Sequence, residues 1–409
     1  MIIRLDSLVD VESIQMARIM VVAGGLWQCP IVKTAKEMGH HVLCSNLYED
    51  SPAFEFADES RVANVLDKER NLKIAKEYEP DVVLTEQTDI AVPTVAFLAE
   101  KLNLKGIGID VAERFTNKFK MREYASRAGI PMPKYRLCHN MDEAADFLNE
   151  VKTCIIKPVD SQSSRGIHIV KTRDDIAKYF DDCIQYSNVE KAILIEEFID
   201  GTEFTVDGVK TQDEYVVTAI SEKEHYTYNP NVAKRLKFTQ THNKYDYEKL
   251  RRENADMIAT MGLPFGLTHT EYKYRDGKFY LIETAARGGG TKISSDITKL
   301  VSGIDCNRLL IRMLMGETDK IIREKHHDCA VLGFFDFKPG VIKEIVGIEE
   351  GRGLNGVWDL KLEVNIGDVL GEAQDDRSRC GYYILFADSE EELDNRERQL
   401  KETVRVITG

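Results

Sequence analysis

The sequence predicts a mixed fold in which a parallel α/β unit is followed by a larger α+β unit. Residues 18–112 alternate apolar runs with helical patterns, which favours a parallel sheet covered by helices. From Phe115 onward, several strand patterns follow one another in succession, which is typical of α+β units. The composition, with 43% hydrophobic and 30% charged residues, is that of a globular protein and excludes wholesale disorder.

The N-terminal unit begins with a continuous apolar strand at residues 18–23. This strand ends at Gly24 and Gly25, and a helix with Pro30 near its first turn follows. The letters GGLWQC do not fit the GxGxxG dinucleotide pattern, so we interpret the glycines as a tight strand-to-helix turn. The further elements expected here are a strand at 41–45, a helix at 68–77, a strand at 81–85 and a helix at 91–102.

The α+β unit starts with a basic helix at residues 117–128. We find no internal repeat and no long linker, so we expect the domains to pack against one another. The elements expected after the basic helix are strands at 135–138, 154–157, 167–170, 192–197, 202–210, 214–221, 267–273, 279–284, 330–337 and 341–346, and helices at 141–151, 172–185, 246–261, 294–301, 306–315 and 391–406.

Charge and cysteine usage exclude several classes of protein. The net charge of −14 disfavours binding of a nucleic-acid backbone through the overall field of the chain. No run approaches about 18 consecutive apolar residues, so we expect no membrane-spanning helix. Acidic residues interrupt the apolar part of the N-terminus, whereas a signal peptide has an apolar region without acids. The eight cysteines are scattered without a CxxC pair, which is typical of a reduced compartment. We therefore expect a cytoplasmic protein that binds neither nucleic acid nor a membrane.

Lys157 ends an apolar strand pattern and precedes a polar loop of small residues. A lysine at this point places an ammonium group at a fixed position, and the loop of residues 160–166 ends at Gly166. Backbone N–H groups and serine hydroxyls of such a loop can bind a chain of phosphates. The loop is no P-loop, because GKS and GKT are absent. An ordinary mobile hairpin loop explains the same residues equally well.

Two acids, Glu196 and Glu197, end a strand pattern and are followed by Phe198 and Ile199. Extended backbone at this point can hydrogen-bond the edge of a purine, and Glu203 on the next strand can accept hydrogen bonds from ribose hydroxyls. The alternative is an edge hairpin with solvated acids, which these residues alone favour.

Glu271 and Glu283 lie on the two strands of a hairpin that we expect to turn at residues 275–277. Side chains alternate faces along a strand, so the carboxylates share a face if the loop has an odd number of residues, with Gly277 left-handed in a bulge. Two such carboxylates suit a hard divalent cation that also binds phosphate oxygens. Arg287, just beyond this strand, can stabilise a developing anion. The alternative is a pair of surface acids on an exposed strand.

In this order, the three motifs resemble the ATP-grasp superfamily, and the resemblance covers about residues 18–320. It implies that ATP is held between two α+β lobes and that a carboxylate is activated as an acylphosphate, which an amine or another nucleophile attacks. The resemblance assigns ATP binding to Lys118, Lys157, Ser163, Ser164, Gly166, Glu196, Glu197, Phe198, Ile199, Glu203 and Ile282. It assigns metal binding to Glu271 and Glu283, and catalysis to Arg287 and Lys157.

The resemblance also implies how the chain is organised. We expect an N-terminal parallel-sheet pre-ATP-grasp domain at residues 1–112, an ATP-grasp domain at 113–325 with a mobile lid lobe at about 133–199, and a C-terminal α+β subdomain at 326–409. The sequence departs from the family pattern Glu-x-Asn-x-Arg at Ala285. Alanine cannot ligate magnesium, so water or a phosphate oxygen takes its place, or the second metal site is weakened.

The C-terminal letters FFDFKPGVIKEIVGIEEG and the run GGGTKISSDITKLVSGIDCNRLL resemble the L-amino-acid ligase branch. We therefore expect an ADP-forming carboxylate–amine ligase for an amino acid or similar small acid, which uses ATP and magnesium, or manganese in its place. Its partners are then a small carboxylate and an amine, and a homodimer is expected because relatives are often dimers. Lys234 and Arg235, in the aromatic and basic segment 225–242, are candidates to bind a carboxylate, although solvation of a loop explains them better.

Three alternatives stay open. Biotin carboxylase and carbamoyl phosphate synthetase modules are also similar, and either would make this chain a bicarbonate-activating enzyme. Ala285 allows a non-catalytic ATP-binding subunit with a weakened magnesium site. A kinase-like transfer that stops at the phosphorylated product is the third alternative.

Overall fold

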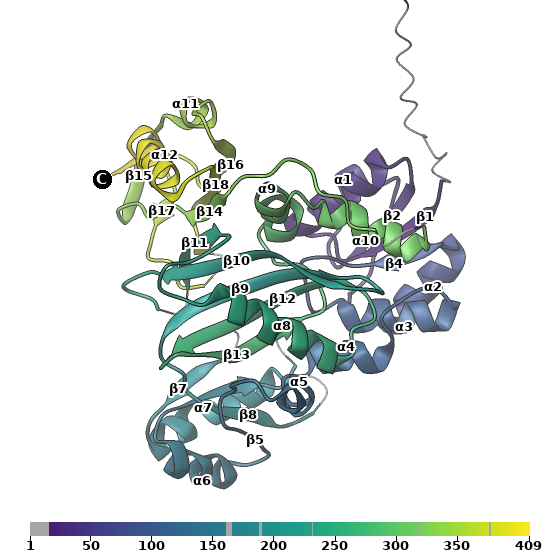
Figure 1. The fold of residues 1–409 in the computed structure, drawn as a ribbon, viewed down its shortest axis with the longest axis vertical. Helices are drawn as coiled ribbons and strands as arrows, with labels where there is room; N and C mark the ends of the chain where they lie inside the picture. The colour runs from purple at the N-terminus through teal and green to yellow at the C-terminus, as the bar shows by residue number, and fades with distance from the viewer. Residues whose placement is uncertain (1–15, 161–165, 188–189, 231, 318–319, 376–377) are drawn as a thin grey trace, which may run out of the picture.

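The computed structural model describes residues 16–160, 166–187, 190–230, 232–317, 320–375 and 378–409. Figure 1 shows an α/β unit at the N-terminal side, a large central sheet, a small lobe against one end of that sheet and the C-terminal segment at the other end. The sheets are one parallel sheet followed by antiparallel ones, which confirms the predicted α/β and α+β classes.

The N-terminal sheet is parallel, with strand order β3-β2-β1-β4. β1 buries four of its five residues completely, as expected for a strand covered by helices on both faces. β3 was not predicted, because it is a charged, largely exposed edge strand. The elements are β1 (Arg18–Val22), the 3-10 turn Leu26–Gln28, α1 (Cys29–Glu37), β2 (His41–Asn46), the 3-10 turn Pro52–Phe56, β3 (Glu59–Val62), α2 (Lys68–Tyr78), β4 (Val82–Leu84), α3 (Val92–Leu102) and α4 (Ile109–Thr116).

The central sheet has eight antiparallel strands in the order β13-β12-β9-β10-β11-β14-β18-β16. Alternation along β9 sends Phe204 and Val206 into a core with helix α8, while Glu203 faces the opposite side. Figure 1 shows α8 lying across this face of the sheet. The strands are β9 (Thr202–Lys210), β10 (Tyr215–His225), β11 (Ala233–Thr239), β12 (Gly266–Arg275), β13 (Lys278–Ala285), β14 (Cys329–Phe334), β16 (Val357–Leu362) and β18 (Gly381–Ala387), and α8 is Tyr247–Met261.

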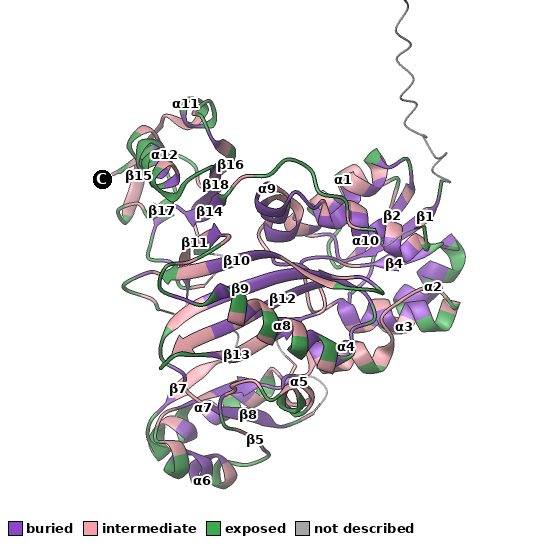
Figure 2. Ribbon diagram, viewed as in Figure 1, coloured by how far each residue is buried: buried purple, intermediate pink, exposed green. Residues whose placement is uncertain are grey.

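A small lobe contains a four-stranded antiparallel sheet in the order β5-β8-β6-β7, with two helices packed on it. Its apolar core lies between the sheet and the helices, and Figure 2 shows exposed residues on the outer sides of α6 and α7. Two short helical segments lead into the lobe from the N-terminal unit. The elements are α5 (Lys118–Ala125), the 3-10 turn Ser126–Ala128, β5 (Tyr135–Cys138), α6 (Met141–Val151), β6 (Cys154–Pro158), β7 (His168–Val170), α7 (Arg173–Gln185) and β8 (Ile193–Glu197).

The C-terminal segment continues the central sheet through β14, β18 and β16. The predicted helix at 391–406 is too long, because the chain turns extended at Val404 and its β-branched end pairs with β15. The remaining elements are the π-helical turn Ile293–Ile297, α9 (Thr298–Ser302), α10 (Cys306–Met315), β15 (Gly340–Val346), α11 (Ile348–Arg352), β17 (Val369–Leu370), α12 (Glu390–Thr403) and β19 (Arg405–Thr408).

Part of the segment 225–242, in which Lys234 and Arg235 are candidates to bind a substrate carboxylate, is the sheet strand β11. Lys234 forms an ion pair with Asp336 at 2.7 Å, and Arg235 lies 2.9 Å from Glu397. These two cations therefore bind carboxylates of the protein itself, because the C-terminal strands and α12 bring acids next to β11.

Among the residues that the structure describes, no helix is both long enough and apolar enough to cross a lipid bilayer. All eight cysteines are free thiols, and every one except Cys380 is buried. Burial raises the pKa of Cys138, Cys154 and Cys183 to about 12, so these thiols stay protonated and pack as small apolar groups.

Candidate active site

A cavity of about 440 Å³ lies on the face of the central sheet that α8 leaves open. Its walls come from the N-terminal unit, the small lobe, the strands β9 to β14 and the glycine-rich loop after β13. Among the predicted site residues, it is lined by Lys118, Glu203, Glu271, Glu283 and Arg287.

Glu271 and Glu283 are direct cross-strand partners on β12 and β13, so their carboxylates share a face of the sheet. The prediction of a shared face is confirmed, but the predicted three-residue loop is wrong. Arg275 pairs with Lys278, which leaves a two-residue turn whose residues have positive φ angles of 50° and 78°.

A bulge at Ile282 accounts for the shared face. The register shifts after Glu271, so that Tyr272 pairs with Leu281 and Ile282 is one extra residue on β13. Without the extra residue, the two-residue turn would point Glu283 to the face of α8. The backbone carbonyl of Ile282, a residue that the resemblance assigns to ATP binding, accepts a hydrogen bond from Arg122.

Each metal-site candidate is paired with a lysine, of which Lys118 is buried and Lys223 is partly buried. Lys118 Nζ lies 2.5 Å from Glu283 Oε1, and Lys223 Nζ lies 2.6 Å from Glu271 Oε1 and 2.6 Å from Glu203 Oε1. Burial alone would lower the pKa of Lys223, but the two carboxylates raise it well above its usual value. Lys223 therefore stays charged between the acid predicted for ribose and an acid predicted for the metal.

Glu203, predicted to bind ribose, lies among three cationic or basic side chains. Besides Lys223, His225 is 3.4 Å and Lys273 is 3.5 Å from its Oε2 atom. Burial would raise the pKa of Glu203, but Lys223 and His225 hold it well below its usual value. The carboxylate is therefore ionised and can accept hydrogen bonds.

Glu196 forms a buried triad with Arg122 and Lys157, named here the Glu196 triad. Its side chain is 1% exposed, Arg122 Nε donates to Oε1, and Lys157 Nζ lies 2.5 Å from Oε2. Burial would raise the pKa of Glu196, but the two cations lower it to about 2. The carboxylate of Glu196 therefore binds these two cations, and only its backbone is left to contact the edge of a purine, as expected from the sequence.

The backbone beside the triad is largely paired. The N–H of Glu197 donates to Lys134 and that of Phe198 donates to Thr153. Ile199, which the resemblance assigns to ATP binding, is buried at 3% exposure. The predicted phosphate-loop residues Ser163 and Ser164 lie outside the described residues. Gly166 has a φ of 67°, and a Cβ there would meet Tyr186 at 2.7 Å and Pro158 at 3.0 Å, so glycine is required.

Arg287 is fixed by the N-terminal unit. Its Nε and Nη2 atoms donate to the two oxygens of Asp89 at 3.1 and 2.7 Å, a bidentate pair. Burial would lower the pKa of Arg287, but Asp89 raises it, so the guanidinium stays charged. The loop after β4, which carries Asp89, thus positions the arginine from the N-terminal unit.

Two buried acids hold the glycines after Arg287. Gly288 N–H donates to Glu86 at 2.6 Å, and Gly289 N–H donates to Asp207 at 3.1 Å. A Cβ on Gly288 would lie 2.2 Å from Ser294, and one on Gly289 would lie 2.6 Å from Asp207. Only glycine allows the loop this close approach to both carboxylates.

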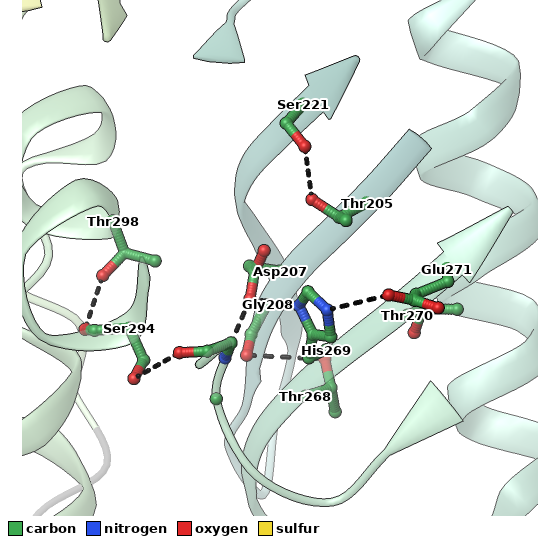
Figure 3. Close-up of polar contacts among 12 residues, drawn as sticks. Thr205, Asp207, Gly208, Ser221, Thr268, His269, Thr270, Glu271, Ser294 and Thr298 are labelled. Carbon is green, nitrogen blue, oxygen red and sulfur yellow. Dashed lines mark hydrogen bonds and ion pairs between the residues drawn. The ribbon is translucent and has the colours of Figure 1, made fainter. Parts of the chain in front are cut away.

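A buried chain of polar groups links that loop to the metal-site candidate Glu271 (Figure 3). His269 Nδ1 lies 2.9 Å from Asp207 Oδ1, and His269 Nε2 lies 3.8 Å from Glu271 Oε1. Burial alone would lower the pKa of His269, but Asp207 and Glu271 raise it to about 9. The ring is therefore a cation at neutral pH and presents positive charge to the cavity.

The donor set at Glu271 and Glu283 fits magnesium. Among the described residues there is no group of three or more His, Cys, Asp or Glu side chains able to hold a metal by themselves. Magnesium is ordinarily bound by one or two carboxylates together with water and substrate phosphates, so two carboxylates suffice. Ala285 lines the same cavity and supplies no ligand.

Residues 150–296 match the family described as the ATP-grasp domain. The chain contains an ATP-grasp domain. Residues 333–409, which follow it, match L-amino acid ligase C-terminal domain 2. Both matches agree with the resemblance inferred from the sequence motifs.

Solved structures share the fold across nearly the whole chain. Phosphoribosylglycinamide synthetase from Anaerococcus prevotii has a TM-score of 0.77 at 19% identity, covering 97% of this chain and 100% of that one. L-amino acid ligase from Bacillus licheniformis has a TM-score of 0.77 at 21% identity, covering 96% and 99%. At these identities the similarity concerns the fold.

Among curated relatives, alanine–anticapsin ligase of Bacillus subtilis strain 168 is 27% identical over 272 residues, 60% of this chain and 56% of that protein. The chain spans about half the length of the curated relatives it matches, between 44% and 63% for the first three.

Several residues around the ATP-grasp domain were missed from the sequence. One group follows β4, where Glu86 and Asp89 stand at the carboxyl end of a parallel strand. Ligands of α/β sheets gather at that end, so this position is a usable signal. Lys223 also had a signal, since it lies across from Glu203 in the register of β9 and β10. Arg122 gave no such signal, because a basic residue in a basic helix is ordinarily expected to be exposed to solvent.

Proposed function

We propose that this chain is an ATP- and magnesium-dependent ligase that joins a small carboxylate to an amine, forming ADP and phosphate. The observation that carries the proposal is the juxtaposition of Glu271 and Glu283 with Lys118 and Arg287 in one cavity. Domain limits near residues 112 and 325 are part of the same proposal. The matches to the ATP-grasp domain and to the L-amino acid ligase C-terminal domain support the proposed ligase function, as does the similarity to a relative named as a ligase.

Acylphosphate formation brings two anions together, so neutralisation and alignment dominate its barrier. Lys118 and Arg287 supply fixed positive charge, and Asp89 keeps the guanidinium in one orientation. Magnesium, held by Glu271 and Glu283, would neutralise phosphate oxygens. The lobe with Lys157, whose Ile167 lines the cavity, would exclude water from the acylphosphate.

The proposed reaction has two steps. A carboxylate oxygen attacks the terminal phosphorus of ATP, the bond to the bridging oxygen breaks, and ADP leaves with that oxygen. The amine nitrogen then attacks the acyl carbon, the bond to the phosphate oxygen breaks, and phosphate leaves. The nitrogen gives its proton to phosphate or to water, so the products are amide, ADP, phosphate and a proton.

The test is ADP release with pairs of amino acids and small acids, with bicarbonate as a separate arm. We expect release that depends on one acid–amine pair. Glu283→Gln should abolish it, whereas Glu248→Gln, a change on the exposed side of α8, should leave it unchanged. Release with bicarbonate alone would favour the bicarbonate-activating alternative. ATP binding without substrate-dependent ADP would favour a non-catalytic subunit, the function that Ala285 motivates.

A further inference from the structure

Lys223 on β10 contacts two carboxylates that the proposed reaction needs for different purposes. Its ammonium lies 2.6 Å from Glu203, predicted to bind ribose, and 2.6 Å from Glu271, a metal-site candidate. Glu203 is the direct cross-strand partner of Lys223, but Glu271 lies on β12, on the far side of β9. The lysine side chain therefore crosses β9 to reach the metal-site candidate.

Two small residues leave room for this crossing. Thr205 on β9 is the cross-strand neighbour of both Ser221 and Glu271, and its hydroxyl lies 2.6 Å from that of Ser221 (Figure 3). Both residues are buried and stand on the cavity face of the sheet, because side chains two positions apart along a strand share a face. The side chain of Lys223 is only 12% exposed. Its contact with Glu271 is therefore part of the packed sheet and not that of a loose surface lysine.

Every carboxylate in the described lining of the cavity is paired with a lysine or an arginine. The four ion pairs join Asp89 to Arg287, Glu283 to Lys118, and both Glu203 and Glu271 to Lys223. His269 adds a further positive charge 3.8 Å from Glu271 (Figure 3). A divalent cation that enters this cavity without a nucleotide therefore meets carboxylates whose charge is already neutralised.

Phosphate groups change this balance of charge. A nucleotide brings several negative charges into the same cavity, and these attract the ammonium of Lys223 away from Glu271. Glu271 then becomes available to magnesium, which proteins ordinarily bind through one or two carboxylates together with substrate phosphates. The lysine and the metal thus compete for one carboxylate, and the presence of phosphates favours the metal.

We propose that Lys223 is the resident counter-ion of the metal site, which neutralises Glu271 in the nucleotide-free protein and prevents free divalent cations from binding until phosphates arrive. The inference rests on the magnesium site of the proposed function. Metal and nucleotide then bind cooperatively, and coupling between two sites is ordinarily about 5- to 150-fold. Lys223 acts through Glu271 and is therefore a positioning residue.

The experiment measures binding of Mn²⁺, a paramagnetic probe for the magnesium site, by electron paramagnetic resonance in the absence of nucleotide. Lys223→Met removes the ammonium and keeps a long, flexible side chain. Lys273→Met is the matched control, because Lys273 lies 3.5 Å from Glu203 and pairs with this acid rather than with Glu271. Glu271→Gln is tested alone and together with Lys223→Met, and circular dichroism checks the folding of each variant.

For the wild type we expect Mn²⁺ alone to bind with a dissociation constant in the millimolar range or weaker. Lys223→Met should bind Mn²⁺ about 10- to 100-fold more tightly, because Glu203 and Glu271 are then uncompensated and attract a cation. Adding Glu271→Gln should abolish this gain. Lys273→Met should stay within about threefold of the wild type, because Lys223 still neutralises both acids.

A second measurement separates this role from a merely structural one. In the presence of EDTA, a non-hydrolysable ATP analogue should bind about tenfold more weakly to Lys223→Met than to the wild type, because the two uncompensated acids repel its phosphates. Calorimetry measures this difference. The substitution therefore strengthens binding of the metal and weakens binding of the metal-free nucleotide, whereas a structural defect would weaken both.

Micromolar binding of Mn²⁺ to the nucleotide-free wild type that is lost in Glu271→Gln would overturn the inference, and this comparison does not need Lys223→Met to fold. Unchanged Mn²⁺ binding in Lys223→Met would overturn it as well. None of these measurements uses an acid or an amine. ADP release from an acid–amine pair together with unchanged Mn²⁺ binding in Lys223→Met would therefore refute the inference alone. The expected gain in Mn²⁺ binding without ADP from any pair would refute the ligase function alone.

Discussion

Glu196→Gln probes the energetic weight of the Glu196 triad. The substitution keeps the size of the side chain but removes the charge between Arg122 and Lys157, which are both buried. A carboxyl whose pKa falls from 4.5 to about 2 on folding contributes roughly 3 kcal/mol, at 1.36 kcal/mol per pH unit. Removing one member of a buried ion pair costs about 3–5 kcal/mol, which is of the same order.

The sign of the pH dependence follows from the lowered pKa. The stabilisation is complete above about pH 4.5 and is lost as the pH falls toward 2, because the unfolded state then binds a proton that the folded state does not bind until about pH 2. The stability difference between wild type and Glu196→Gln should therefore be constant from pH 8 down to about 5 and shrink below that. Urea denaturation followed by circular dichroism across this range measures it.

The neighbouring Glu197→Gln is the matched control. Glu197 forms a partly exposed ion pair with Arg275 at 2.9 Å, and such pairs contribute about 1 kcal/mol or less. If the two variants shift the urea midpoint equally, or if the Glu196 difference is undiminished at pH 3, the reasoning about the triad is wrong.

Three further substitutions test Arg287 in the loop after β13, Glu86 after β4 and His269 on β12. Arg287→Lys cannot form the bidentate contact with Asp89, so we expect kcat to fall about 100-fold while ATP affinity in a binding titration stays within threefold; a loss confined to affinity would contradict this. Glu86→Gln replaces the carboxylate that accepts from Gly288, and it should lower kcat about tenfold at unchanged ATP affinity. His269→Asn should destabilise the protein at neutral pH, and the difference from wild type should be largest below pH 6.5 and vanish as the pH rises through about 9, because the pKa of His269 is raised on folding. Thermal melts at pH 6, 8 and 10 decide the last case, and a pH-independent difference would refute it.

Much of the fold was predictable because its signals are local. Apolar runs and turn glycines located β1, β2 and β4 and the hairpin of β12 and β13 within a few residues. Charged or short strands such as β3 gave no signal, since their residues resemble those of loops.

The site was predictable as residue types but not as contacts. Glu271 and Glu283 could be paired from strand alternation, and the pairing holds. The partners of other residues could not be predicted, because Arg122 and Glu196 are 74 positions apart and Arg287 and Asp89 are 198 apart. Such ion pairs depend on how the lobes and the N-terminal unit pack.

Because of the bulge at Ile282, the number of residues in β13 decides on which face of the sheet the Glu283 carboxylate lies. Deleting one residue there would leave the turn and the ladder of β12 and β13 intact, yet it would swing the carboxylate of Glu283 toward α8. Insertions and deletions at this point are therefore far more harmful than most substitutions around them. In the divergence of related sequences, this single extra residue should be inherited as strictly as the two glutamates that it brings together.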